Sequence, residues 1–363
     1  MTRLRWEQAD EPKAQGSLFD EPVFEREPGR GEFRGIEFLH VKADRLVNEV
    51  KGSPFGFRYT INAYRGCSHA CSYCYARPTH TYLDLDADRD FERKIVVKVN
   101  AVSALRHELD PRRWAGELIA MGTNTDPYQR AEGKYRLTRG IVEVLAERAN
   151  PFSILTKSTL VLRDVALLAE AAERTNVRVN LSIGTLDEAV WRATEPGTPH
   201  PRRRVRAVEQ LNAAGVPCGV LIAPVLPELS DSPDQLEDVV RACVDAGARS
   251  ISTVLLHLRP GVKDVFLSRL AETHPHLVAG YRRRYGDRPY AARADHQAVD
   301  AMVRNLVRRF GGVTANGTDP RHHTGQAAGA DGAGAGVAVP PPRRAGHRSL
   351  AESEPTTTQL PLL

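Results

Sequence analysis

The chain has 363 residues, and its 50 Lys and Arg against 45 Asp and Glu leave a formal net charge of +5. Apolar residues make up 41% of the chain and charged residues 26%, which is close to the average of globular proteins. These values exclude a wholly disordered, collagen-like or membrane-embedded chain. The longest nearly apolar stretch, residues 216–226, contains two prolines and is shorter than the roughly 20 residues that a membrane helix needs.

The first residues of the chain are polar and mixed in charge, without the apolar run of a secretory signal. Five cysteines in a chain of this length do not suggest a disulfide scaffold. We therefore expect a cytoplasmic protein that does not associate with a membrane.

Both ends of the chain differ in composition from its middle. Residues 325–363 are rich in Ala, Gly and Pro, and residues 1–30 contain few core-forming side chains. Such segments bury too little apolar surface to offset the entropy cost of ordering, so we predict that the tail is disordered and the N-terminal extension partly so. The predicted organisation is a partly disordered N-terminal extension (1–50), a core barrel (51–260), a helical C-terminal extension packed on the barrel (261–324) and a disordered tail (325–363).

Between the two ends, short β-branched runs alternate with stretches in which apolar residues recur every three or four positions. The expected strands are residues 57–63, 95–99, 117–121, 152–156, 177–183, 219–224 and 250–256. The expected helices are residues 102–109, 138–148, 163–173, 202–214, 232–246 and 295–310. Gly215 and Gly247 mark the ends of two of these helices. Alternation of this kind builds parallel βαβ units, so the sequence predicts an α/β fold with an open or closed barrel.

Three of the five cysteines crowd into one segment directly after the first expected strand. Cys67, Cys71 and Cys74 have the spacing Cys-x3-Cys-x2-Cys. Three soft thiolates on one loop suit an iron–sulfur cluster, and three ligands leave the fourth iron of a [4Fe–4S] cluster open to a small molecule. A structural zinc site is the alternative, with His69 as a fourth ligand, although zinc sites usually have cysteines two residues apart.

With Tyr73 before its last cysteine, the motif resembles the Cys-x3-Cys-x-aromatic-Cys signature of radical S-adenosylmethionine (SAM) enzymes. The resemblance implies a partial (β/α)6 barrel in which the cluster loop follows the first strand. It also implies that the open iron chelates SAM, and that reduction of the cluster cleaves SAM to a 5′-deoxyadenosyl radical. An electron donor such as flavodoxin or ferredoxin would be a partner. A cluster at the C-terminal mouth of a barrel agrees with where such folds build active sites.

The strand end after the motif offers short polar side chains to such a cofactor. Gly122 permits a close backbone approach, and Thr123, Asn124 and Thr125 follow it. Family members use this strand end to hold the amino group of SAM, most often with Gly-Gly-Glu. This chain departs from that form, which leaves the contact residue open.

Later strand ends supply further candidates. Lys157 could meet the carboxylate of the cofactor, or it could be a solvated lysine at a strand end. Ser182 could contact the ribose or the carboxylate, and the backbone of Ala223 could meet the adenine. Glu195 and Arg204 could pair and position the ribose, although Arg204 could also belong to a solvated helix start.

The order of these pieces resembles the spore photoproduct lyase-like branch, a group also called DNA repair photolyases. The similar pieces are the cysteine motif with its tyrosines, Thr-x-x-Asp, Thr-Lys, the Ser of Asn-Leu-Ser-Ile-Gly, Glu-x-Gly-Thr-Pro with a downstream Arg, and Gly-Val-x-x-Ala-Pro. Together they cover about residues 60–230. By this resemblance Lys157, Ser182, Glu195, Arg204 and Ala223 hold the cofactor.

One departure separates the chain from the lyase itself. The lyase uses a cysteine near its Thr-x-x-Asp region as hydrogen donor, and tyrosines beside the last cluster cysteine are thought to relay the hydrogen. Tyr73 and Tyr75 match those tyrosines, but residues 119–129 contain no cysteine. We interpret Cys218 and Cys243 as buried and inert. The lyase reaction is therefore not assigned, and Tyr73 could simply pack against the cluster.

The tail carries a separate hypothesis. Gln359 to Leu363 reads Gln-Leu-Pro-Leu-Leu, which resembles the peptide by which bacterial DNA-repair proteins dock on the sliding clamp. Residues 15–19 are a weaker likeness. Short motifs of this kind often arise by chance.

The sequence thus predicts a radical SAM enzyme that abstracts a hydrogen atom from an unidentified substrate. Nucleic acid is the favoured substrate class, by the resemblance and by the mild basic excess of the middle of the chain. The alternatives are radical modification of a peptide or small molecule, and a non-catalytic iron–sulfur accessory protein of nucleic-acid repair.

Overall fold

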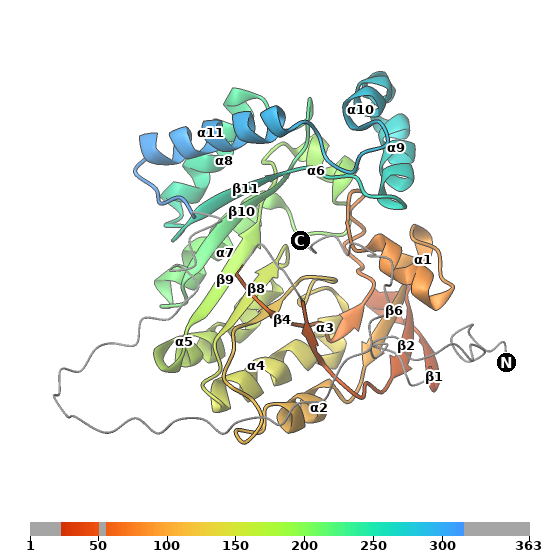
Figure 1. Ribbon diagram of the computed structural model, residues 1–363, viewed down its shortest axis with the longest axis vertical. Coiled ribbons are helices and arrows are strands. Elements are labelled where there is room, and N and C mark those ends of the chain that lie inside the picture. Colours follow the sequence, from red (N-terminus) through yellow and green to blue (C-terminus); the bar gives the residue numbers. More distant parts are fainter. Residues whose placement is uncertain (1–22, 51–55, 316–363) are drawn as a thin grey trace, which may run out of the picture.

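A seven-stranded sheet forms the centre of the protein, in a computed structural model that describes residues 23–50 and 56–315 (Figure 1). Its strand order is β11-β10-β9-β8-β7-β4-β3. All neighbours from β4 to β11 pair in parallel, and β3 adds an antiparallel edge. The strands are β3 (Val47–Glu49), β4 (Tyr59–Ile61), β7 (Ile119–Met121), β8 (Phe152–Thr156), β9 (Val177–Ser182), β10 (Cys218–Val225) and β11 (Ile251–Leu255).

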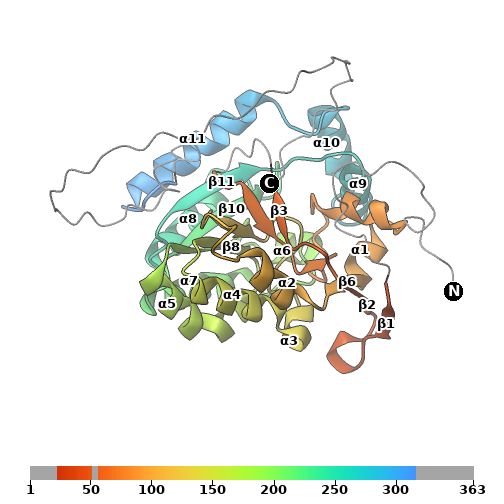
Figure 2. The same ribbon diagram turned by 60° about the horizontal axis from the view of Figure 1, so that its bottom comes forward.

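Helices follow these strands and cover the outer side of the sheet (Figures 1 and 2). They are α2 (Ala101–Glu108), α4 (Leu137–Glu147), α5 (Val165–Arg174), α7 (Pro201–Ala213) and α8 (Pro233–Asp245), and α11 (Arg293–Arg309) packs on α8 and β11. All six predicted helices are confirmed, with small shifts at their ends. Parallel strands in chain order with helical crossovers confirm the predicted α/β fold and its (β/α)6 arrangement.

Local sequence signals explain the helix ends. Ser232 caps α8 with a capping box that Gln235 completes, and Pro233 occupies its first turn. Gly215 and Gly247 have φ values of +84° and +71° just after α7 and α8, where a left-handed residue ends a helix at least cost. Both predicted helix ends are therefore confirmed.

A second, smaller sheet has the order β1-β2-β6-β5. It contains β1 (Glu25–Pro28), β2 (Glu37–Val41), β5 (Tyr64–Arg65) and β6 (Lys94–Lys98). The strand predicted at 95–99 is therefore β6, which pairs with β2 in this smaller sheet. It does not belong to the barrel. The alternation of apolar runs could not reveal this, because β2 lies before the first strand that the sequence analysis expected.

Several short elements complete the fold. The sequence analysis missed α1 (Arg89–Arg93), α3 (Ala131–Tyr135), α6 (Glu188–Thr194), α9 (Val262–Thr273) and α10 (Val278–Tyr285), and the 3-10 turns η2 (Gly31–Phe33), η3 (Arg77–Leu83), η4 (Thr159–Asp164) and η5 (Pro275–Leu277). Helices α9 and α10 lie on the same side of the molecule as α1 and the small sheet (Figures 1 and 2).

The described residues leave some predictions untouched. The predicted tail at 325–363, the clamp-binding segment from Gln359 to Leu363 and its weaker likeness at 15–19 all lie outside them. The division of the chain at residues 50, 260 and 324 stays a prediction. None of the described helices combines the length and the apolar character that crossing a bilayer requires.

Candidate functional site

The three cysteines of the motif lie on a tight loop between β5 and η3, at the carboxyl end of the parallel strands. Cys67, Cys71 and Cys74 are free thiols, and all three line one cavity of about 170 Å³. Gly66 starts the loop at φ +81°, and a Cβ there would come within 2.9 Å of the Phe91 carbonyl oxygen. The turn therefore needs glycine just before the first cysteine.

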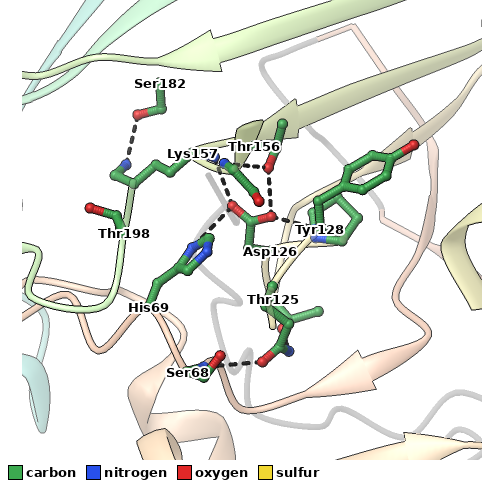
Figure 3. Close-up of polar contacts among 12 residues, drawn as sticks. Ser68, His69, Thr125, Asp126, Tyr128, Thr156, Lys157, Ser182 and Thr198 are labelled. Carbon is green, nitrogen blue, oxygen red and sulfur yellow. Dashed lines mark hydrogen bonds and ion pairs between the residues drawn. The ribbon is translucent and has the colours of Figure 1, made fainter. Parts of the chain in front are cut away.

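Two residues of the next strand end hold this loop. The Gly66 carbonyl accepts hydrogen bonds from the Thr125 hydroxyl at 2.6 Å and from the Gln129 amide at 2.8 Å. The Gln129 side chain also accepts from the Ser68 backbone N–H at 3.0 Å (Figure 3). The Thr125 hydroxyl is thus committed to the loop, and Gln129 is a loop anchor that the sequence analysis missed.

The loop after α6 closes on the other side of the cysteine loop. The Gly197 N–H donates to the His69 carbonyl at 3.0 Å, and the Ser72 N–H donates to the Thr194 carbonyl at 2.9 Å. A Cβ on Gly197 would lie 2.2 Å from the Ser68 carbonyl oxygen. The Gly of the Glu-x-Gly-Thr-Pro segment therefore lets two backbone segments touch.

Two arginines donate to carbonyl groups of the cysteine loop. The fully buried Arg77 guanidinium donates to the Cys71 carbonyl at 2.8 and 3.0 Å. Arg269, from α9, donates to the Ala70 carbonyl at 3.2 Å. Both guanidinium groups also contact the Glu92 carboxylate, so α9 is tied to the loop through ion pairs.

Lys157, Ser182 and Ala223 meet at neighbouring strand ends. The Lys157 ammonium donates to the Ser182 hydroxyl at 2.7 Å and lies 3.3 Å from the Ala223 carbonyl oxygen, which also accepts from Ser182 at 2.8 Å (Figure 3). The ammonium also lies 5.6 Å from the centre of the Tyr73 ring. All four residues line the cavity, so the strand ends place a cation beside the cysteines.

Glu195 and Arg204 pair behind this group, as the sequence analysis expected. The Arg204 guanidinium is fully buried and contacts the Glu195 carboxylate, and it donates to the Ser182 carbonyl at 3.0 Å. Tyr73 donates its hydroxyl to the same carboxylate. Burial raises the pKa of Glu195, but Arg204, Lys157 and Tyr73 outweigh it and keep the pKa below its ordinary value.

A buried contact between a carboxylate and an imidazole, which the sequence analysis did not assign, lies at the cavity wall. Asp126 Oδ2 is 3.3 Å from His69 Nδ1 (Figure 3). The carboxylate also accepts from the Thr156 hydroxyl at 2.6 Å and from the Lys157 N–H at 2.7 Å. Burial raises the pKa of Asp126, but these partners keep it below its ordinary value. Asp126 is the aspartate of the Thr-x-x-Asp segment named in the sequence analysis, but no role was assigned to it there.

The predicted site residues at the carboxyl end of β7 do not all line the cavity. Asn124 lines the cavity, and its side-chain oxygen is buried with no hydrogen-bond partner among the described residues. Thr123 does not line the cavity, because its hydroxyl accepts from Asn62 at 3.2 Å and its carbonyl accepts from the Tyr75 hydroxyl. Gly122 brings β7 close to β8, since a Cβ there would lie 2.1 Å from the Leu155 carbonyl oxygen.

The cavity therefore gathers every predicted site residue except Thr123, Glu195 and Arg204. Those that line it are Cys67, Cys71, Cys74, Tyr73, Tyr75, Asn124, Thr125, Lys157, Ser182 and Ala223. His257, which follows β11, lines it as well, and burial with the nearby Arg259 lowers its pKa to about 4. Glu195 and Arg204 do not line the cavity but contact the wall residues Tyr73 and Ser182.

The side chains of this cavity fit an iron–sulfur cluster with SAM. Soft thiolates suit iron, the Lys157 ammonium suits a carboxylate, and the unpartnered oxygen of Asn124 can accept a hydrogen bond from an amino group. In the described part of the chain, no three His, Cys, Asp or Glu side chains are grouped to hold a single metal ion.

Comparisons with known proteins agree with this geometry. The sequence profile of the Radical SAM superfamily matches residues 61–243. An uncharacterized protein of Mycobacterium tuberculosis is 44% identical over 280 residues, which cover 77% of this chain and 82% of that protein. An uncharacterized protein of Methanocaldococcus jannaschii is 32% identical over 196 residues, 54% of this chain and 70% of that protein.

Among solved structures, the fold is similar to that of spore photoproduct lyase. A variant with bound AdoMet and dinucleoside spore photoproduct gives a TM-score of 0.55 at 18% identity, covering 75% of this chain and 79% of that chain. At this identity the likeness concerns the fold alone. Family membership implies SAM and an iron–sulfur cluster as cofactors. Motif, fold and family profile together show that this chain belongs to the radical SAM superfamily.

Proposed function

We propose that this protein is a radical SAM enzyme in which Cys67, Cys71 and Cys74 bind a [4Fe–4S] cluster and the neighbouring strand ends bind SAM. The observation that carries the proposal is the single cavity that joins the three thiols to Lys157, Ser182 and Asn124. When bound and reduced, the cluster supplies the electron that cleaves SAM to a hydrogen-abstracting radical. A small electron-transfer protein such as flavodoxin or ferredoxin would deliver that electron.

Each wall residue has a separate task in this proposal. Lys157 binds the cofactor carboxylate, and Ser182 holds the lysine in place through its hydroxyl. Asn124 accepts from the cofactor amino group, and the Ala223 carbonyl faces the adenine. The Glu195 carboxylate lies 4.0 Å from the Lys157 ammonium and offsets part of its charge beside the thiols.

Tyr73 and Tyr75 flank the last cysteine and differ in their hydrogen bonds. Tyr73 donates to the Glu195 carboxylate and Tyr75 to the Thr123 carbonyl. Burial is the main cause that raises the pKa of both phenols, so both stay protonated at neutral pH. We assign Tyr73 to positioning Glu195, and Tyr75 to the cavity wall where it can meet substrate.

We further propose a nucleotide-containing substrate. The support is the fold shared with spore photoproduct lyase, whose solved structures hold a dinucleoside photoproduct. The lyase reaction itself is not proposed, because residues 119–129 have no cysteine to return a hydrogen atom. The other described cysteines, Cys218 and Cys243, are fully buried in β10 and α8 and do not line the cavity.

The test is anaerobic reconstitution with iron and sulfide, followed by electron paramagnetic resonance of the reduced protein with and without SAM. We expect a cluster signal that SAM changes, and the same result in Cys243→Ala. Cys71→Ala should lose the signal. A cluster whose signal ignores SAM would favour the non-catalytic accessory protein. Zinc in the purified protein, with no cluster after reconstitution, would overturn the proposal.

A further inference from the structure

A second and larger cavity lies inside the barrel, toward the amino-terminal ends of the strands. Its volume is about 560 Å³, and residues from β4's flank, β7, β8, β9, β10 and β11 line it. That size lies in the usual range of ligand pockets, roughly 300 to 1,000 Å³. We call it the inner chamber. Nothing in the proposed cofactor site uses its polar residues.

The strand register explains why the inner chamber is not filled. Side chains alternate along a strand, so Arg178, Asn180 and Ser182 share the inward face of β9. Beside them, Ser153 pairs with Arg178, and Gly219 pairs with Asn180. Closed barrels fill this space with large branched side chains. Here small and polar residues leave the space open.

The charge inside the inner chamber has one sign. Arg178 and Arg249 are the charged side chains among the described residues that line it, and no Asp or Glu joins them. Arg178 is half-buried, and burial lowers the pKa of its guanidinium. In the described part of the chain no carboxylate pairs with it. A half-buried cation without a counter-charge is costly, and an anionic ligand would remove that cost.

Neutral polar groups beside Arg178 also line the inner chamber. Asn180 Oδ1 and Ser250 Oγ would each lie 2.7 Å from a Cβ on Gly219, so both side chains lean over that glycine. Ser153 and Ser252 add hydroxyl groups to the same wall. Such a wall can hydrogen-bond the polar parts of a ligand whose anionic end lies at Arg178.

The inner chamber adjoins the cofactor cavity. Gly122, Leu155, Leu221 and Val254 line both spaces. A molecule bound at Arg178 therefore lies on the inner side of the wall whose outer side faces Lys157 and Ser182.

From this arrangement we infer that the inner chamber binds the substrate by an anionic phosphate group, which Arg178 receives, with Asn180 and Ser153 beside it. The inference rests on the proposed function for its claim that the ligand is the substrate. It deepens that function by naming a phosphorylated molecule of about nucleotide size. The remainder of the substrate then points toward the wall that the inner chamber shares with the cofactor cavity.

The experiment is calorimetric titration of the reconstituted holoenzyme with thymidine monophosphate, thymidine and a single-stranded hexathymidylate, without reductant. We expect the monophosphate to bind at least about tenfold more tightly than thymidine, the effect of one charge-assisted contact. Arg178→Gln should lose that preference. Arg174→Gln, which changes an exposed arginine on α5, should keep it within about twofold. If hexathymidylate binds in a way that also depends on Arg178, the substrate is a nucleic-acid strand. If it does not bind, the substrate is a free nucleotide.

Thermal unfolding of the free protein provides the second readout. A structural Arg178 would lower the melting temperature when replaced, whereas an unpaired cation that waits for a ligand should leave it unchanged or raised in Arg178→Gln. Equal affinity of the wild type for thymidine and its monophosphate, or equal losses in both variants, would overturn the inference. Because no reductant is present, this result is independent of whether SAM is cleaved.

Discussion

The ammonium of Lys157 lies 2.7 Å from the hydroxyl of Ser182, although the two residues are 25 positions apart in the chain. They end adjacent parallel strands, β8 and β9, so the sheet brings them together at its carboxyl edge. The Ser182 hydroxyl donates its hydrogen bond to the Ala223 carbonyl, which leaves its lone pairs to accept from the ammonium. The lysine is thus fixed at the cavity wall before any ligand arrives.

Replacing this lysine should weaken cofactor binding. We expect Lys157→Met to bind SAM at least about tenfold more weakly, because a charge-assisted contact to a carboxylate contributes roughly 1.5–3 kcal/mol. Lys42→Met, at an exposed position on the small sheet side, should bind normally. The measurement is the SAM concentration that half-saturates the change in the cluster spectrum. Equal values for both variants would contradict the assigned role.

The Glu195–Arg204 pair should be strongly coupled. Glu195→Gln or Arg204→Met alone leaves one buried charge without its partner, which costs about 3–5 kcal/mol of unfolding free energy. The double variant should be more stable than the sum of the single losses predicts. Denaturant unfolding of the four proteins gives the coupling energy. A coupling energy near zero would show that the two side chains do not stabilise the folded protein as a pair.

The ion pairs of α9 should protect the cysteine loop. Arg269→Gln removes the contacts to Ala70 and Glu92, so we expect the reconstituted protein to lose iron to a chelator several-fold faster. Arg192→Gln breaks only an exposed pair with Glu188 and is the control. Iron release at the same rate in both variants would show that the contacts of α9 do not protect the cysteine loop.

The close approach at Gly197 allows a steric test. Gly197→Ala places a methyl group against the Ser68 carbonyl, so we expect a loss of at least about 2 kcal/mol in unfolding free energy and impaired cluster assembly. Gly133→Ala meets nothing closer than 4.0 Å inside α3 and should be neutral or slightly stabilising. The two unfolding curves and the two iron contents provide the comparison. A Gly197→Ala protein with normal stability and iron would contradict the packing.

Lys98 predicts a pH dependence of stability. Its ammonium on β6 is fully buried and finds no hydrogen-bond partner in residues 23–50 and 56–315, and burial with Arg65 lowers its pKa to about 7 from 10.5. Between pH 7 and 10.5 the unfolded chain binds a proton that the folded protein does not, so this lysine destabilises less as pH rises. We expect Lys98→Met to have an unfolding free energy about 1–4 kcal/mol higher than that of the wild type at pH 7 and below.

That gain should shrink steadily as the pH approaches 10. Unfolding free energies of wild type and Lys98→Met from pH 6 to 10 test it, with Lys42→Met as control. A difference that is flat across this range would mean that Lys98 keeps its ordinary pKa in the folded protein.

The sequence could predict those parts of the site that depend on parallel strands alone. Lys157, Ser182 and Ala223 each lie at or near the end of a recognisable strand, and parallel strands end at one edge, so their meeting needed no knowledge of side-chain packing. The pairing of Glu195 with Arg204 could be predicted because both lie near one turn of the chain.

Other parts depend on contacts between distant segments. Arg269 reaches the cysteine loop across 199 positions, and only the packing of α9 reveals it. The role of Asp126 depends on the rotation of His69 toward it. Thr123 was expected in the cofactor site, yet its hydroxyl is taken by Asn62. The strand at 95–99 was recognised but not its sheet, because strand pairing is non-local.

The most direct test of the central claim is the formation of 5′-deoxyadenosine from SAM by the reduced, reconstituted protein. The account predicts 5′-deoxyadenosine from the wild type and from Cys243→Ala, and none from Cys71→Ala. A protein that holds a full cluster, binds SAM and yet forms no 5′-deoxyadenosine under reduction would contradict it.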